Sequence, residues 1–197
     1  MDTDNFFRIK TNNLPPRKGR VLISEPFLYE GFFGRSVVLL VEHNEEGTLG
    51  VVMNKPILCT NDDLFVEDNE HQITVGRTYL GGPVETDKMF FMHPYNDIPG
   101  RLKVKNGLYF GGNSTVFNEK VMRGEINLDH VRFFVGYSGW GKGQLDSELR
   151  RNSWLVSETS VEELLRINAG GMWKRYVRHM GTSYKNWLYL PEDPSLN

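Results

Sequence analysis

The chain has 197 residues, of which 39% are hydrophobic and 24% charged, with a net charge of −2 and a sequence pI near 6.2. This length and composition predict one soluble globular domain and exclude a largely disordered chain, and the mildly acidic balance argues against a dedicated DNA-binding domain, which must neutralise phosphates. No apolar run approaches the roughly 20 residues that cross a bilayer, and the N-terminus lacks a signal-peptide pattern, so we expect a cytoplasmic protein without a membrane segment.

The first half of the chain is expected to begin with strands. Residues 1–18 are polar and end in two prolines, which predicts an N-terminal arm before a single domain over 19–190 and a tail over 191–197. A short strand is predicted at Val21–Ser24, stopped by Pro26. The runs Val37–Val41 and Thr48–Met53 are almost wholly apolar, and the polar turn between them predicts an antiparallel hairpin of buried strands.

Polar residues gather at the ends of this hairpin. Arg35 and Ser36 precede its first strand, Glu42 and His43 follow it, and Asn54 follows the second strand. Neighbouring residues on a strand point to opposite faces, so the adjacent Glu42 and His43 cannot both bind one metal ion without a bulge. We therefore expect no metal site there, and expect His43 to bond to its own turn more readily than to act as a general base.

The middle of the chain combines an acidic tract with two glycine pairs. Cys59 is the only cysteine, which excludes an intrachain disulfide and a cysteine-rich zinc site, and it is expected to be buried. A loose capping box predicts a short helix over Thr60–Phe65. The segments Tyr79–Pro83 and Tyr109–Asn113 are similar strand endings with a glycine pair, which either permit close strand packing or line a shared cleft.

The second half contains the predicted helices. Ser114 is expected to cap a helix that runs to Gly124. A buried strand is predicted at Val131–Val135, followed by a glycine loop over 136–143 and a helix that begins at Gln144. Further helices are predicted from Ser160, where Glu163 completes a capping box, and over Met172–Met180 after a glycine pair.

The glycine loop resembles two catalytic motifs and lacks one residue of each. Residues Gly136–Gly143 fit the phosphate-binding loop, except that Gly143 stands where magnesium binding needs a Ser or Thr hydroxyl. Ser138 lies where a nucleophile elbow requires it, but Trp140 replaces the closing glycine. Two interpretations remain open: a tight turn that packs Trp140 and Tyr137 onto the core, or a site that binds an anion or polar ligand through free backbone N–H groups at the helix start.

These motifs identify a family. The sequence resembles the AlgH/YqgE family of bacterial proteins, whose pattern matches Gly136, Tyr137, Gly139, Trp140, Gly143, Gln144 and Leu145. The resemblance also covers 19–26, 33–56, 79–83 and 110–113. Family members commonly have proline where this chain has Lys142, which implies that the phosphate-loop lysine is incidental. The family carries a regulatory name from alginate biosynthesis, and the resemblance implies no general activity and no cofactor.

The predicted fold class is α+β, because hairpins come first, helices mostly follow, and no regular βα alternation calls for a parallel sheet. The resemblance implies a complex antiparallel, partly barrel-like sheet flanked by helices. The candidate ligand-binding cleft is made of strand-end, glycine-pair and loop residues: Arg35, Ser36, His43, Asn54, Gly82, Gly112, Ser138, Trp140, Gly141 and Gln144.

Three hypotheses for function follow. The first is a regulatory or binding protein without catalysis, which recognises a protein partner or a small polar or anionic ligand and needs no cofactor or metal. The alternative is a hydrolase-type enzyme that uses Ser138 or His43 in a cleft between the glycine loop and the 35–56 hairpin. The second alternative is a DNA-binding regulator that uses Lys174, Arg175 and Arg178, although nucleic acid is not the partner that the overall charge favours.

Overall fold

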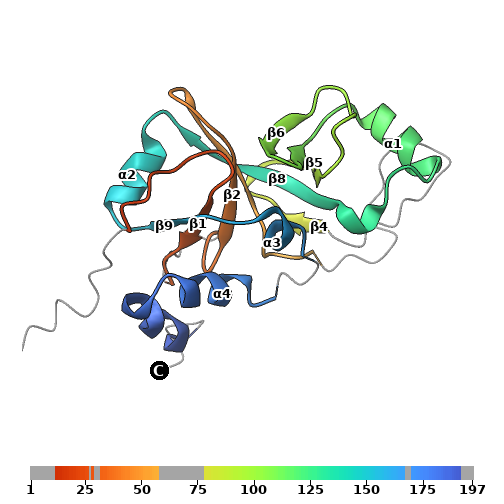
Figure 1. Ribbon diagram of the computed structural model, residues 1–197. Coiled ribbons are helices and arrows are strands. Elements are labelled where there is room, and N and C mark those ends of the chain that lie inside the picture. The colour runs from red at the N-terminus through yellow and green to blue at the C-terminus, as the bar shows by residue number, and fades with distance from the viewer. Residues whose placement is uncertain (1–11, 27, 29–31, 58–77, 167–169, 192–197) are drawn as a thin grey trace, which may run out of the picture.

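The computed structural model describes residues 12–26, 28, 32–57, 78–166 and 170–191, which form a single α+β domain (Figure 1). Nine strands form one sheet within these ranges. The strands are β1 (Val21–Ser24), β2 (Val37–His43), β3 (Gly47–Val52), β4 (Thr78–Leu80), β5 (Val84–His93), β6 (Leu102–Lys105), β7 (Leu108–Phe110), β8 (Arg132–Gly141) and β9 (Trp154–Ser157). The helices are α1 (Ser114–Met122), α2 (Gln144–Arg150), α3 (Val161–Leu165) and α4 (Met172–His179), with 3-10 segments η2 (Leu128–His130) and η3 (Thr182–Tyr189).

The long strand β8 connects the two halves of the sheet. The strand order is β6-β7-β5-β8-β3-β2-β1-β9, and β4 pairs with β8 in parallel beside this path. The first half of β8 pairs with β4 and β5, and its last residues pair with β3. In Figure 1, β8 crosses the middle of the molecule from the β2–β3 hairpin towards α1. The antiparallel pairing of all neighbours on the main path agrees with the predicted fold class.

The predicted glycine loop over 136–143 is largely strand. β8 does not end at Val135 but continues to Gly141, paired with β3 from Ser138 onward. Gly136 has a φ of 68°, and an added Cβ there would lie 2.6 Å from the Gly82 carbonyl oxygen. The glycine at this position therefore permits close backbone packing without ending the strand. Because the prediction treated glycine as a sign that the strand ends, the predicted C-terminal boundary of this strand at Val135 was wrong.

Other elements follow their local sequence signals closely. The first strand and the antiparallel hairpin of β2 and β3 are confirmed, as are the starts of α2 at Gln144 and of α3 after Ser160, whose hydroxyl accepts from the Glu163 N–H at 3.1 Å. The cap of α1 was predicted one residue late: Asn113, not Ser114, is the N-cap, and its side chain accepts from the Val116 N–H at 3.0 Å. Strands β6 and β9 were not predicted. Cys59 and the predicted helix Thr60–Phe65 lie outside the described residues.

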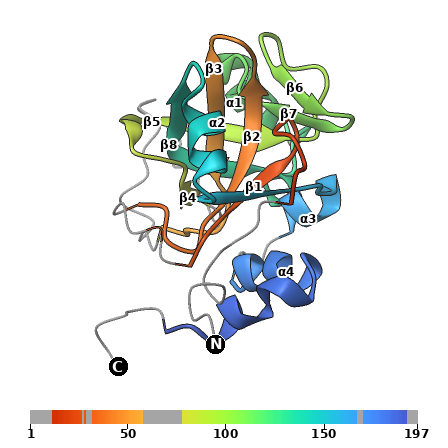
Figure 2. The same ribbon diagram turned by 90° about the vertical axis from the view of Figure 1, so that its left-hand side faces the viewer.

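The helices cover three separate apolar clusters. α4 and η3 pack on β1 and β2, where Trp173 donates from Nε1 to the Ser24 carbonyl at 2.9 Å. α2 covers a cluster that contains Trp140 and Trp154, and α1 covers one that contains Phe117. Figure 2 shows α2 in front of the β2–β3–β8 side and α4 below β1. Each cluster is built on a different part of the sheet, which leaves some sheet surface uncovered.

None of the helices in the described parts of the chain has the length and apolar character that crossing a bilayer requires.

Candidate functional site

The turn between β8 and α2 is bonded to side chains of α2 itself. Gln144 accepts from the Gly141 N–H at 3.0 Å through Oε1, and donates from Nε2 to Glu148 at 3.0 Å. The other carboxylate oxygen of Glu148 accepts from the indole N–H groups of Trp140 and Trp154, at 2.9 and 2.8 Å. Because Gln144 already satisfies the Gly141 N–H, the arrangement supports a structural role for this turn rather than anion binding.

Trp140 lies in the core. Its side chain is 5% exposed, and its ring is stacked on Phe33, with 6.1 Å between centroids, and contacts Trp154 edge-on at 6.0 Å. The sequence alone indicated no binding partner for Glu148. Its role as the acceptor for two indoles depends on the approach of β9 to β8, which no local pattern reveals.

The residues proposed for hydrolysis make other bonds. Ser138 is fully buried, and its hydroxyl donates to the Gly81 carbonyl at 3.1 Å. The Nδ1 atom of His43 lies 2.7 Å from the Thr48 hydroxyl oxygen in the same hairpin. His43 therefore bonds within its own hairpin, as expected from the sequence. Among the described residues no hydrogen bond joins Ser138 to a histidine or a carboxylate, so the base that would activate a serine nucleophile is not beside it.

Arg35, Ser36 and Asn54 fasten the start of the hairpin. Asn54 accepts from the Val37 N–H at 2.8 Å and donates to the Arg35 carbonyl at 2.9 Å, which holds Arg35 at its positive φ of 50°. The N–H of Ser36 bonds to the Ser24 hydroxyl at 2.7 Å. The Arg35 guanidinium lies over the Trp173 ring and donates to two carbonyls of the C-terminal segment, Leu190 and Pro191, both at 2.7 Å.

The two glycine pairs lie in different surroundings. An added Cβ on Gly82 would lie 2.0 Å from the Tyr137 carbonyl group, whereas one on Gly112 would lie 2.7 Å from a methyl carbon of Ile98. Gly82 thus packs against β8, and Gly112 packs near the α1 cluster. Of the ten candidate residues, Trp140 and Gly141 line the groove described next.

An open groove lies on the face of the sheet where β2, β3 and β8 meet. Its volume is about 410 Å³, and its lining includes Glu42, Glu46, Leu49, Tyr137, Gly139 and Gly141. The strand register explains this grouping, since Glu42 is opposite Leu49, Leu49 is opposite Gly139, and Gly47 is opposite Gly141. Directly opposite residues share a face of the sheet. Trp140 and Thr48 also border the groove, although both residues are largely buried.

The floor of this groove is glycine that the fold does not require. Gly139 and Gly141 are exposed and have no positive φ. An added Cβ would meet nothing closer than the Tyr137 ring at 3.4 Å and the Gln144 Oε1 at 3.9 Å, respectively, both ordinary contacts. Glycine inside a strand weakens it and often marks a place where a ligand or another backbone approaches. In the sequence, Gly139 and Gly141 alternate with Ser138 and Trp140, which is the pattern of a strand with glycine on one face. The prediction of a loop over 136–143 missed this pattern.

The charge of the groove is one-sided. Glu42 and Glu46 supply two exposed carboxylates, and the residues that line the groove include no Lys, Arg or His. Within the described residues, no three His, Cys, Asp or Glu side chains come together in a way that could hold a metal ion. The charged side chains that line the groove are therefore acidic, without a basic residue among them.

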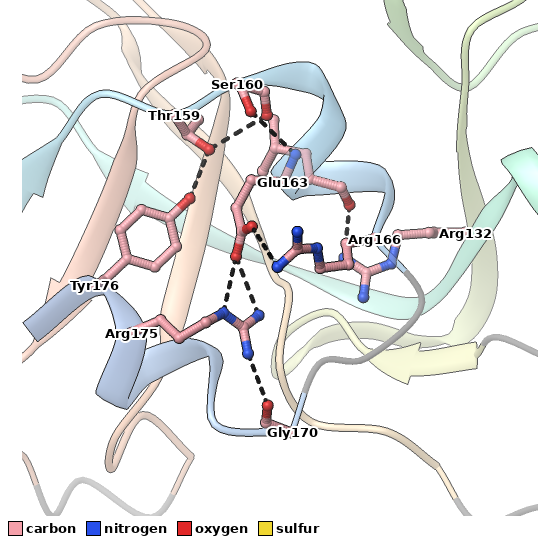
Figure 3. A network of polar contacts seen from close by, with 9 residues as sticks. Arg132, Thr159, Ser160, Glu163, Arg166, Gly170, Arg175 and Tyr176 are labelled. Atoms are coloured by element: carbon pink, nitrogen blue, oxygen red, sulfur yellow. Dashed lines mark hydrogen bonds and ion pairs between the residues drawn. The ribbon is translucent and has the colours of Figure 1, made fainter. Parts of the chain in front are cut away.

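A second polar cluster joins α3 to α4 and is shown in Figure 3. The Glu163 carboxylate accepts from Nε and Nη2 of Arg175 at 3.1 and 3.0 Å, and Arg166 lies 3.7 Å from it. Arg175 also donates to the Gly170 carbonyl at 2.9 Å. These bonds fix α4 against α3 across the glycine pair that separates them.

This cluster bears on the basic surface considered for DNA. Arg175 donates to Glu163 and to a backbone carbonyl, so much of its guanidinium is already used within the protein. Lys174 and Arg178 are exposed. Two exposed bases form a small footprint compared with the several phosphate contacts of a DNA-binding domain.

Because His93 is buried, we expect the free energy of unfolding to fall in mild acid. The imidazole is fully buried, and its Nε2 lies 2.9 Å from the Gly111 carbonyl oxygen. Burial lowers the pKa of His93 below its usual value of about 6.5, because the charged form loses its hydration. Below about pH 6.5 the unfolded chain therefore binds a proton at His93 that the folded chain does not bind. The contribution of His93 to the free energy of unfolding is complete above about pH 6.5 and is lost as the pH falls from there towards the pKa of the folded state.

Urea unfolding at pH 7.5, 6.5 and 5.5 measures this effect. The His93→Gln variant keeps a side-chain N–H that can reach Gly111 but does not titrate, so its free energy of unfolding should fall less over this range than that of the wild type. Equal falls in both proteins would show that His93 does not contribute.

Comparisons with known proteins cover nearly the whole chain. The model of the AlgH-like family matches residues 21–185. A UPF0301 protein of Bacteroides fragilis is 40% identical over 202 residues and covers 100% of this chain and 99% of the relative. A UPF0301 protein of Parabacteroides distasonis is 42% identical, with 98% of each chain covered.

Solved structures show the same fold. The AlgH protein from Pseudomonas aeruginosa has a TM-score of 0.66 at 25% identity and covers 93% of this chain and 98% of that chain. The protein DIP2367 from Corynebacterium diphtheriae has a TM-score of 0.70 at 21% identity, covering 93% and 96%. The names of these relatives state no ligand, partner or reaction.

Proposed function

This chain belongs to the AlgH-like family, and we propose that it is a regulatory binding protein without catalytic activity, whose binding site is the groove over Gly139 and Gly141. The observation that carries the proposal is the groove itself: exposed glycines, which neither backbone conformation nor packing requires, floor a hollow of about 410 Å³ on an uncovered part of the sheet. Volumes of roughly 300–1,000 Å³ are typical of ligand sites.

The bonding of Ser138 supports binding over hydrolysis. A serine nucleophile must reach its substrate and a base, whereas this hydroxyl is buried and donates to the Gly81 carbonyl. The Gln144 side chain likewise already accepts from the Gly141 N–H, one of the backbone donors that a phosphate at this turn would use. The bonds of Ser138 and Gln144 both hold β8 in place, and the face of β8 that carries Gly139 and Gly141 stays open.

Site-specific photocrosslinking tests the proposal. A photoreactive phenylalanine placed at Val84, which lines the groove opposite Tyr137 and leaves both carboxylates in place, is compared in native lysate with one at Asn106, an exposed turn residue between β6 and β7. We expect an adduct from position 84 that is absent from position 106 and disappears when Gly141→Val fills the groove. Mass spectrometry of the adduct distinguishes a small ligand from a protein.

Two outcomes would overturn the proposal. One is equal labelling from the two positions, or labelling at position 84 that survives Gly141→Val. The other is turnover on a panel of esters, amides and phosphoesters that Ser138→Ala abolishes while the variant stays folded.

A further inference from the structure

We propose that the groove binds an extended, arginine-bearing segment of a protein partner. This inference rests on the proposed function, since it names the class of partner that the same site would recognise. It is carried by three features of the groove: its backbone floor, its two carboxylates and its tyrosine.

The floor determines how close an occupant can come. Gly139 and Gly141 are exposed and carry no side chain of their own, and the nearest side-chain atoms, from the Tyr137 ring and Gln144, lie 3.4 and 3.9 Å from the positions of an added Cβ. An occupant beside the Tyr137 ring can therefore lie in van der Waals contact with the backbone of β8. The paired Gly47 of β3 continues this floor across the sheet. An extended peptide, which is narrow and flat, fits such a surface better than a bulky helix does.

The openness of the groove favours a peptide over a small molecule. Small-ligand sites usually enclose most of the surface of their ligand. Here the floor residues Gly139 and Gly141 and the carboxylate residues Glu42 and Glu46 are all exposed, so an occupant keeps one side in solvent. A peptide that is held on one side and continues beyond the groove at both ends meets this condition.

The charge selects the side chain. Glu42 and Glu46 attract a cation, and the lining contains no basic residue that would already neutralise them. Tyr137 lies on the same face of β8 as Gly139, because the two are separated by one residue. A guanidinium is planar, donates to carboxylates in pairs and stacks on aromatic rings, which an ammonium group does less well. The combination of carboxylates, an aromatic ring and a flat floor therefore favours arginine over lysine.

A peptide titration tests the inference. The probe is a synthetic peptide of four alternating Arg-Ser pairs with blocked ends, added to the ¹⁵N-labelled full chain at low salt. We expect shifts of the Gly139 and Gly141 amide signals, weaker binding of the matched Lys-Ser peptide, and none of the Glu-Ser peptide. Moderate salt should weaken the binding, because exposed charges are screened.

Paired charge variants locate the effect. Glu42→Gln combined with Glu46→Gln should weaken binding of the Arg-Ser peptide about tenfold, as the loss of two exposed charge interactions predicts. The control combines Glu119→Gln with Glu162→Gln, which removes the same net charge from exposed positions outside the groove and should leave binding unchanged. The thermal midpoints of all variants show that they remain folded.

The outcomes separate this inference from the proposed function. Absence of peptide binding, or equal weakening by both variant pairs, overturns the arginine-peptide assignment even if position 84 still forms its specific crosslink. Binding of free arginine as tight as that of the peptide also overturns it, because the ligand would then be a small molecule. Loss of the specific crosslink overturns the proposed function instead.

Discussion

Replacing Trp140 with alanine is expected to lower the free energy of unfolding by about 3 to 5 kcal/mol, the range for large-to-small changes in a core. The indole is 5% exposed and packs between Phe33 and Trp154. Alanine would leave a cavity beneath β8 and remove one of the two indole donors to Glu148. Urea denaturation followed by far-UV circular dichroism measures the loss without depending on tryptophan fluorescence.

The Trp140→Phe variant separates packing from hydrogen bonding. Phenylalanine keeps most of the ring but not the N–H, so its cost should be nearer to about 1 to 2 kcal/mol, the scale of one hydrogen bond to a charged acceptor plus a small void. Both variants are also unfolded with and without phosphate. A small loss for Trp140→Ala, together with a phosphate-dependent stabilisation of the wild type that this variant lacks, would restore the anion-site interpretation of this turn.

The elements that sequence predicted well are those whose signals are local. Val37–Val41 is apolar without interruption, which is typical of a strand buried on both faces, and the polar turn after it favours the antiparallel return. Ser160 and Glu163 lie three residues apart, the spacing at which an N-cap hydroxyl accepts from a backbone N–H of the first helical turn. Gln144 likewise begins its helix where the apolar period changes. The order of hairpins and helices predicted the α+β class, and the family resemblance added the AlgH-like assignment.

What the sequence did not reveal depends on contacts between distant segments. Gly136 and Gly139 look like loop residues until β4, β5 and β3 are seen to pack against them, which makes them part of β8. The candidate site was affected in the same way. Arg35 and Gly112 were grouped with Trp140 because a strand end, a glycine pair and the predicted loop were expected to line one cleft. Arg35 instead binds the C-terminal segment, and Gly112 packs against Ile98. The groove itself follows from the register of β3 on β8, which no periodicity specifies.

Replacing Gly82 with alanine is expected to cost about 4 kcal/mol or more, which places it among the exceptional single substitutions. An added Cβ would lie 2.0 Å from the carbonyl carbon and oxygen of Tyr137 and 2.3 Å from the Ser138 nitrogen. These atoms belong to backbone, so no side-chain rotation relieves the overlap, and the segment carrying Gly82 must move away from β8. That movement would break the bonds of the neighbouring Gly81, which accepts from the Val52 N–H and the Ser138 hydroxyl and donates to the Val135 carbonyl.

The matched control is Gly139→Ala, which makes the same chemical change in β8, the strand against which Gly82 packs. There the added Cβ meets only the Tyr137 ring at 3.4 Å, and no positive φ opposes it, so stability should be unchanged or should rise by up to about 1 kcal/mol. Urea unfolding of both variants measures the difference, and if Gly82→Ala yields no folded protein, its soluble yield beside that of Gly139→Ala gives the same ordering. Equal stabilities would mean that β8 is not held by close backbone packing against Gly82. We therefore expect Gly82 to be required for the fold, whereas Gly139 is not required for the fold and instead forms part of the groove.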